Sequence, residues 1–149
     1  MSREYKNRFD ISPAELRILK PLSSPIKIQN YLDTLKINFE EEGETVQSPR
    51  RVLKTKEAHC IEAALLAAAA LWLHDKPPLL IDLKADGVDD DHVIALYKTN
   101  GHFGAISKSN HATLRFRDPI YRTIRELAIS YFHEYFDGKR LKKTLRSYS

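Results

Sequence analysis

A chain of 149 residues, 42% hydrophobic and 30% charged, can form one domain with a hydrophobic core, and this composition excludes wholesale disorder. The net charge of +4 is modest, and a single cysteine excludes an intramolecular disulfide framework and favours a reducing compartment. The polar N-terminus lacks a signal-peptide core, and no apolar stretch is long enough to cross a bilayer. We therefore expect a soluble cytoplasmic protein.

Three Ser-Pro dipeptides mark helix starts in the first third of the chain. Ser12, Ser24 and Ser48 each precede a proline, which is favoured at the first helical position, and Glu15 completes a capping box after the first serine. Apolar residues then recur at helical spacing and predict one buried face: Ile28, Leu32, Leu35 and Phe39. The pattern predicts N-terminal helices within residues 12–54, interrupted by a solvated acidic loop.

An alanine-rich segment follows. Residues 63–71 are all alanine or leucine, the strongest helix formers. Because the segment is apolar on every side, we expect a central, buried helix with Trp72 in the core. Pro77 and Pro78 end it, since proline cannot continue a helix.

The chain then changes to short segments rich in branched and aromatic residues, separated by turn residues. We expect strands at residues 79–84, 92–98, 101–107 and 112–117. Asn100-Gly101 predicts a hairpin turn between two of them, because both residues tolerate positive φ. The meander should therefore be antiparallel.

A final helical pattern predicts a packed helix over residues 118–136. Its apolar face is expected to contain Ile120, Ile124, Leu127, Tyr131 and Tyr135. Helices, an antiparallel meander and a last helix together indicate an α+β fold. We expect a single domain made of N-terminal helices, a core and a solvated basic tail, at residues 12–54, 55–136 and 137–149.

Cys60, the only cysteine, stands at the start of the alanine-rich helix. Free N–H groups at a helix N-terminus lower a thiol pKa, and a nearby imidazole can hold the thiol proton. The same N–H groups can stabilise the oxyanion that forms when a thiolate attacks a carbonyl. The alternative is a buried structural cysteine, which is the favoured interpretation of a lone cysteine when nothing else is considered.

A family resemblance joins this cysteine to the second half of the chain. The order is Cys60-Ile61-Glu62, the alanine-rich helix, a proline-marked exit, His92 opening a strand that runs to Tyr97, a turn, and the aromatic Phe103. From Ser48 to Tyr121 this order resembles the transglutaminase-like branch of the papain-like cysteine superfamily. The resemblance implies a papain/transglutaminase-like core, in which a central alanine-rich helix packs on a small antiparallel sheet.

The resemblance also implies a Cys60–His92 dyad or triad. Where the family carries an aspartate on the next strand, counting from His92 reaches Ser107, which can accept an imidazole N–H but cannot balance an imidazolium. Asp118, in an Asp-Pro pair, is the second candidate by its chemistry. Asn110 could orient the ring instead, and the loop that ends at Asp91 could supply negative charge.

Other polar residues receive simpler interpretations. The acidic residues 89–91 do not complete an EF-hand, because Lys84 and Val93 stand where oxygen ligands are needed. We expect a solvated acidic turn whose field raises the pKa of His92. His59 is expected at a pocket rim or on the surface, and no pattern predicts a metal site or a cofactor.

Two functions remain open. The resemblance implies cysteine-dependent acyl transfer or hydrolysis of a peptide or amide substrate, by a peptidase, an amidase or a transglutaminase-like acyltransferase. The alternative is a non-catalytic binding or scaffold module on the same fold, whose basic tail suggests an acidic partner or nucleic acid. An unrelated nucleic-acid-binding domain is disfavoured, because no strand interleaves aromatic and basic residues on one face. The sequence suggests no membrane partner and leaves the oligomeric state open.

Overall fold

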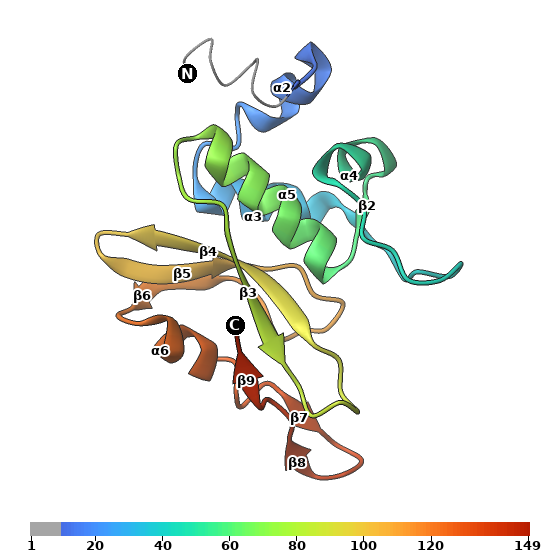
Figure 1. Cartoon of the computed structure of the whole chain (residues 1–149), viewed down its shortest axis with the longest axis vertical. Helices are drawn as coiled ribbons and strands as arrows, with labels where there is room; N and C mark the ends of the chain where they lie inside the picture. Colours follow the sequence, from blue (N-terminus) through green and yellow to red (C-terminus); the bar gives the residue numbers. More distant parts are fainter. Residues whose placement is uncertain (1–9) are drawn as a thin grey trace.

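The computed structural model describes residues 10–149, in which all helices but the last lie on one side of a curled antiparallel sheet (Figure 1). The helices are α2 Pro13–Leu19, α3 Pro25–Thr34, α4 Pro49–Thr55, α5 Cys60–Leu73 and α6 Ile124–Ile129. The five-stranded sheet has the order β6-β5-β4-β3-β9, with β3 Leu79–Lys84, β4 His92–Thr99, β5 His102–Ile106, β6 Arg117–Tyr121 and β9 Ser147–Tyr148. The predicted α+β class is confirmed.

Two further pairs of short strands lie outside this sheet. The pairs are β1 Lys36–Ile37 with β2 Glu57–Ala58, in parallel, and β7 Phe136–Asp137 with β8 Lys142–Lys143, antiparallel. The first pair joins the end of α3 to the entry of α5, and the second pair forms a ribbon near the C-terminus (Figure 1). No helix among residues 10–149 has the length and apolar character needed to cross a membrane.

The three Ser-Pro starts are confirmed. The hydroxyl of Ser12, Ser24 or Ser48 accepts a backbone N–H of its own first helical turn, at the starts of α2, α3 and α4. However, the apolar face predicted for α3 includes Phe39, which lies beyond the end of the helix. The helix ends at Thr34 and the chain turns into β1, so Phe39 lies beyond the helix with 69% of its surface exposed.

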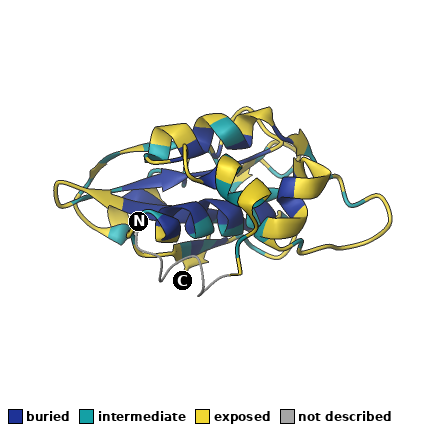
Figure 2. Ribbon diagram, turned by 90° about the horizontal axis from the view of Figure 1, so that it is seen from above, coloured by how far each residue is buried: buried dark blue, intermediate teal, exposed yellow. Residues whose placement is uncertain are grey.

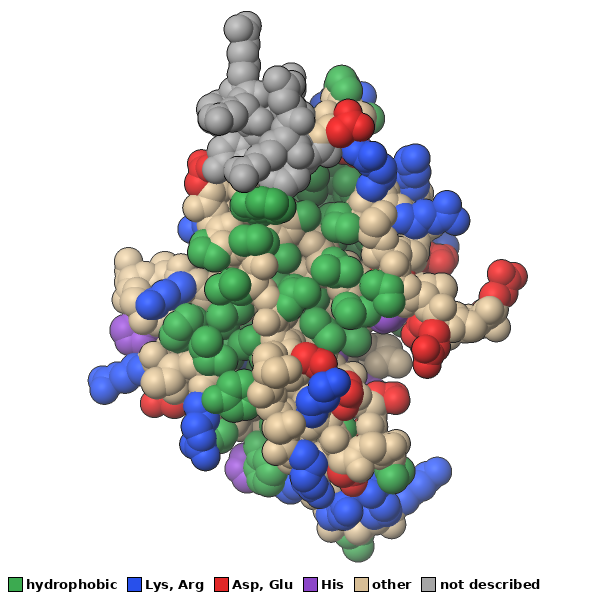
Figure 3. Space-filling model, viewed as in Figure 1, with side chains coloured by type: hydrophobic (Ala, Val, Ile, Leu, Met, Phe, Trp, Pro, Cys, Tyr) green, Lys and Arg blue, Asp and Glu red, His purple; other side chains and the backbone are tan. Residues whose placement is uncertain are grey.

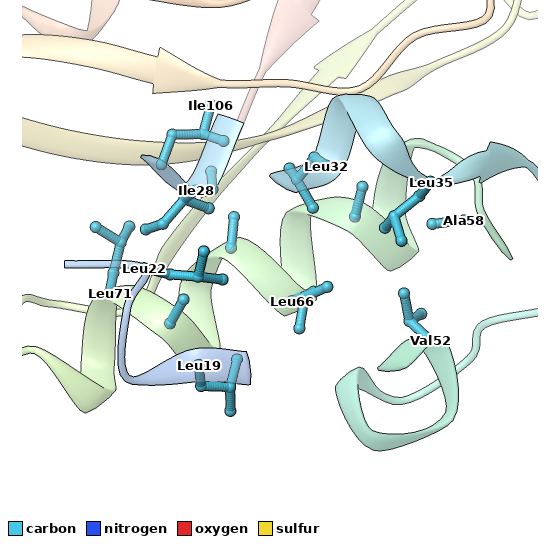
Figure 4. Packing of buried hydrophobic residues seen from close by; sticks show 14 of the residues in the cluster. Leu19, Leu22, Ile28, Leu32, Leu35, Val52, Ala58, Leu66, Leu71 and Ile106 are labelled. Atoms are coloured by element: carbon cyan, nitrogen blue, oxygen red, sulfur yellow. The ribbon is translucent and has the colours of Figure 1, made fainter. Parts of the chain in front are cut away.

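Helix α5 is central, as the alanine-rich segment predicts. It packs on β4, and the hydrophobic core on this side of the sheet joins residues of α3, α4 and α5 to Ile106 of β5 (Figure 4). The expectation for Trp72 is wrong, because this residue is 38% exposed and lies in a groove that is also lined by Leu53. A helix that is apolar all round does not reveal which residue faces outward.

The predicted hairpin is also confirmed. Asn100 and Gly101, with φ of 50° and 80°, turn the chain between β4 and β5. Along β4 the side chains alternate between the two faces of the sheet: Ala95 belongs to the helix-side core, whereas Ile94 belongs to a second core that contains Leu127 of α6. The sheet therefore separates two clusters of packed side chains. In Figure 2 buried residues are concentrated in the interior strands and helices, and exposed residues lie in the outer loops.

The long helix expected over residues 118–136 does not form. Its first part pairs with β5 as β6, which leaves Ile120 65% exposed, and α6 begins only after the cap residue Thr123 and ends at Ile129. Strand β6 also starts later than the expected residue 112, because Leu114 has a positive φ of 61° that interrupts extended backbone.

The basic tail is folded rather than frayed, although Lys139, Lys142 and Arg146 are exposed as expected. Arg140 forms ion pairs with Asp86 and Asp137, and Thr144 is fully buried. The chain then adds β9 to the edge of the sheet beside β3. Lysine and arginine side chains gather over the β7–β8 ribbon, whereas hydrophobic side chains cover much of the surface over α5 and β3 (Figure 3).

Candidate functional site

A pocket of about 560 Å³ lies where the N-terminus of α5 meets the start of β4. Cys60 and His92 both line it, together with the loop after β5 and residues of the turn before β7. The structure therefore brings the two principal candidate residues, which are 32 positions apart in the sequence, to the same cavity.

Cys60 is the first residue of α5 and is partly buried. Two of the backbone N–H groups that favour its thiolate belong to Ile61, the next residue of α5, and to Val93, which follows His92 on β4. Burial raises the pKa of the Cys60 thiol, and the carboxylate of Glu40 adds to this effect, while the N–H groups oppose it. The expected lowering of this pKa is wrong, because loss of solvation outweighs the helix N-terminus.

His92 is only 4% exposed, and its Nε2 lies 2.7 Å from the hydroxyl oxygen of Ser107. The Ser107 hydroxyl in turn donates to the carbonyl oxygen of Leu114 at 2.6 Å. A serine has one hydroxyl proton, so Ser107 must accept from His92, and Nε2 must carry the imidazole proton. Nδ1 is then the nitrogen with a free lone pair.

The pKa of His92 is lowered, whereas the sequence predicted that it would be raised. Burial lowers the pKa of His92 to about 4; the Leu114 carbonyl opposes this shift, and His111 and Arg115 add to it. The expected rise is wrong, because no carboxylate of the acidic turn is among the groups that shift this pKa. At neutral pH the pocket therefore holds a thiol and a neutral imidazole rather than an ion pair.

Of the candidate orienting residues, only Ser107 contacts the His92 ring. Asp118 is exposed on β6 and does not line the pocket. Asn110 lines the pocket with an exposed side chain, and Asp91 directs its carboxylate to the Ala85 N–H. The position that spacing favours is thus the one beside the imidazole.

Sequence reasoning missed two buried residues behind Ser107. Gln29, on α3, forms hydrogen bonds with both the N–H and the carbonyl of Ser107. Lys108 donates from Nζ to the carbonyl oxygens of Leu32 and Leu35, at the end of α3. For Gln29 the sequence offered one signal, a glutamine beside the apolar face predicted for α3. For Lys108 it offered no signal.

Glu62, in the first turn of α5, is fully buried and links the N-terminus of this helix to neighbouring segments. Its carboxylate accepts hydrogen bonds from the Asn38 side chain and from the backbone N–H groups of Gln47 and His59. Burial acts to raise the pKa of Glu62, but these donors together hold it below its ordinary value. His59 lines the pocket and lies 2.6 Å from the Thr45 carbonyl oxygen through Nε2, which agrees with the expected rim position.

In the acidic turn Asp90 and Asp91 are exposed, as expected, whereas Asp89 is half-buried and accepts a hydrogen bond from Thr144. Within residues 10–149 no group of three or more His, Cys, Asp or Glu side chains is arranged to hold a metal ion. A comparison with models of known protein families finds no match, and neither does a comparison with curated proteins. The case for a function therefore comes from the chemistry of the pocket.

Proposed function

We propose that this protein is a cysteine-dependent acyltransferase or hydrolase, built on a papain/transglutaminase-like core and acting on a peptide or amide substrate. One observation carries the proposal: the only cysteine shares a pocket with a histidine whose Nε2–H is bound by Ser107. With Nε2 occupied, Nδ1 is the basic atom of His92. A nucleophile, a base and a group that orients the base are the parts that acyl transfer requires.

In the proposed reaction His92 acts as a general base on a neutral thiol. The Cys60 sulfur bonds to the substrate carbonyl carbon while its proton passes to Nδ1 of His92. N–H groups in the first turn of α5 stabilise the oxyanion. The imidazolium then protonates the leaving amine as the C–N bond breaks. Water or a second amine, deprotonated by the same nitrogen, releases the acyl group from sulfur.

His92 is a weaker base beside Ser107 than it would be beside an aspartate. A hydroxyl fixes the tautomer of His92 but supplies no negative charge to the imidazolium that forms. The low pKa of His92, about 4, has the same consequence. We therefore expect slow acylation that depends on His92, with hydrolysis as the default outcome because water needs no second binding site.

The test is acylation of the full chain by p-nitrophenyl acetate, followed by intact mass. The wild type should gain one acetyl group on Cys60, and Cys60→Ala should gain none. His92→Gln should react more slowly by about a hundredfold, since a general base contributes roughly that much. His102→Gln is the matched control, because His102 lies outside the pocket on β5. Equal rates in wild type and His92→Gln would exclude His92 as the base.

A second measurement uses the direction of the thiol pKa. Because burial raises the pKa of Cys60, alkylation by iodoacetamide should increase with pH beyond the ordinary thiol value of 9.0. Only the thiolate reacts, so the alkylation rate should fall tenfold for each pH unit below the raised pKa of Cys60. A rate that levels off near neutral pH would instead indicate a thiolate–imidazolium pair.

The same features give the non-catalytic binding or scaffold module some support. Within residues 10–149 no carboxylate forms a hydrogen bond with His92, and the pKa values of Cys60 and His92 both move away from those of an ion pair. An acidic partner is less favoured than the tail sequence suggests, because Arg140 and Lys142 are paired with Asp86. Failure of Cys60 to acylate would favour this module.

A further inference from the structure

Gln29 is a buried residue of α3, 5% exposed, whose side-chain amide faces the backbone of Ser107. Its Oε1 accepts the Ser107 N–H at 2.9 Å, and its Nε2 donates to the Ser107 carbonyl oxygen at 2.8 Å. The other Nε2 proton goes to Asp33 Oδ1 at 2.9 Å. A reversed amide would place donor against donor and acceptor against acceptor, so the hydrogen bonds fix its orientation.

The position of Ser107 explains why this amide is needed. Ser107 follows the last residue of β5, and the pairing of β5 with β4 ends one residue earlier, at Ile106. On the other side β6 pairs no further than Ala105. The backbone of Ser107 has thus left the sheet while remaining 1% exposed, and buried peptide groups require partners. Gln29 supplies one donor and one acceptor, as a neighbouring strand would.

We propose that Gln29 is a positioning residue for His92. Its two hydrogen bonds to the Ser107 backbone hold the Ser107 hydroxyl between the Leu114 carbonyl and Nε2 of His92, and this contact selects the imidazole tautomer. The role rests on the proposed function, in which Nδ1 of His92 takes the thiol proton. The hydroxyl has little freedom, with an acceptor at 2.6 Å and the imidazole at 2.7 Å. A displaced Ser107 loses this geometry, and the imidazole is then free to carry its proton on either nitrogen.

Nitrogen NMR of the histidine rings tests this without any reaction. The His92 signals are assigned by their loss in His92→Gln. At pH 7 the wild type should show only the Nε2–H form of His92, and Gln29→Met should show a mixture of both forms. The pKa of His92 should rise in that variant from about 4 toward 6.5, as water reaches the ring.

Gln47→Met is the matched control. The Gln47 amide also binds a backbone carbonyl, that of Glu57, and accepts from Thr55, but it makes no contact with Ser107. This variant should keep the wild-type tautomer. Unchanged His92 signals in a folded Gln29→Met protein would overturn the proposal.

A variant of nearly equal shape covers the case in which Gln29→Met does not fold. The carboxylate of Gln29→Glu can still accept the Ser107 N–H but cannot donate to its carbonyl, so a smaller tautomer change in the same direction is expected. If neither variant folds, Gln29 is a folding residue and the positioning role is overturned. Tautomer changes without any acylation of Cys60 would reject the proposed enzyme while leaving the role of Gln29 intact.

Discussion

The two faces of the five-stranded sheet are built in different ways. On the helix side a 14-residue helix, α5, packs against β4 with a continuous set of fully buried aliphatic side chains. On the other side the longest helix, α6, has six residues, and the chain returns through β7, β8 and β9, each of two residues. A second hydrophobic core lies on this side, and polar contacts at its edge add to it, such as the hydrogen bond from the Tyr131 hydroxyl to the Arg115 carbonyl.

The contrast indicates that the helix side supplies most of the cooperative stability and the C-terminal side is more readily opened. Long helices packed by apolar residues form units that unfold together, whereas short elements joined by polar contacts open locally. The pocket is lined by residues from both sides of the sheet. Cys60 comes from the helix side, and Tyr135 and Phe136 come from the C-terminal side.

The largest expected effect tests this contrast with one substitution on each face. Leu66 of α5 and Leu127 of α6 are both completely buried. Leu66→Ala should lower the free energy of unfolding by about 4 kcal/mol and Leu127→Ala by about 2 kcal/mol, because the surroundings of a short helix can collapse onto the cavity more easily. Urea unfolding at pH 7 measures both values. An equal or reversed order would show that the two faces are equally rigid.

The second effect concerns the polar anchor beneath α5. Glu62→Gln replaces an acceptor of several hydrogen bonds by an amide whose NH2 faces other donors, which should cost about 2 to 3 kcal/mol of stability at pH 7. The exposed Glu57→Gln on β2 is the control and should change stability little.

The pH dependence of the same variant has a defined sign. The folded pKa of Glu62 lies below its ordinary 4.5, so its stabilising effect is complete above that pH and is lost as the pH falls through the folded value. Wild type should therefore lose stability in acid more steeply than Glu62→Gln. Parallel pH profiles for the two proteins, measured by urea unfolding, would contradict the role given to this carboxylate.

The same contrast explains how much of the molecule could be predicted. The starts of α2, α3 and α4 depend on a serine hydroxyl and a backbone N–H within one turn, so local sequence determines them. The apolar spacing over residues 118–136 fits a helix equally well, but pairing with β5 takes the first part into β6. That pairing depends on distant residues, and local periodicity does not contain it.

The candidate site divides in the same way. The spacing taken from the family resemblance leads from His92 to Ser107, and these two side chains do meet. The partner Gln29 lies 78 positions from Ser107 and could not be paired with it from spacing. The pKa of Cys60 was misjudged for another reason: the helix N-terminus acts as expected, but the extent of burial is not readable from the residues nearby.

The smallest expected effect concerns the segment that closes the pocket from the C-terminal side. Arg140 links the β7–β8 ribbon to Asp86, which precedes β4, and it also pairs with Asp137 of β7. Partly exposed ion pairs add little to global stability. Arg140→Gln should therefore leave urea unfolding almost unchanged while increasing amide hydrogen exchange in β7 and β8 by about two- to fivefold.

Arg146→Gln is the control for this variant, since among the described residues the Arg146 side chain forms a hydrogen bond only with the adjacent Leu145 carbonyl. Because Phe136 of β7 lines the pocket, opening of the ribbon should also admit reagent, and Cys60 should alkylate faster in Arg140→Gln than in the control. Faster exchange spread evenly over α5 and the ribbon would mean that the two faces unfold as one unit. Exchange confined to the ribbon would place the weaker wall of the pocket on the C-terminal side.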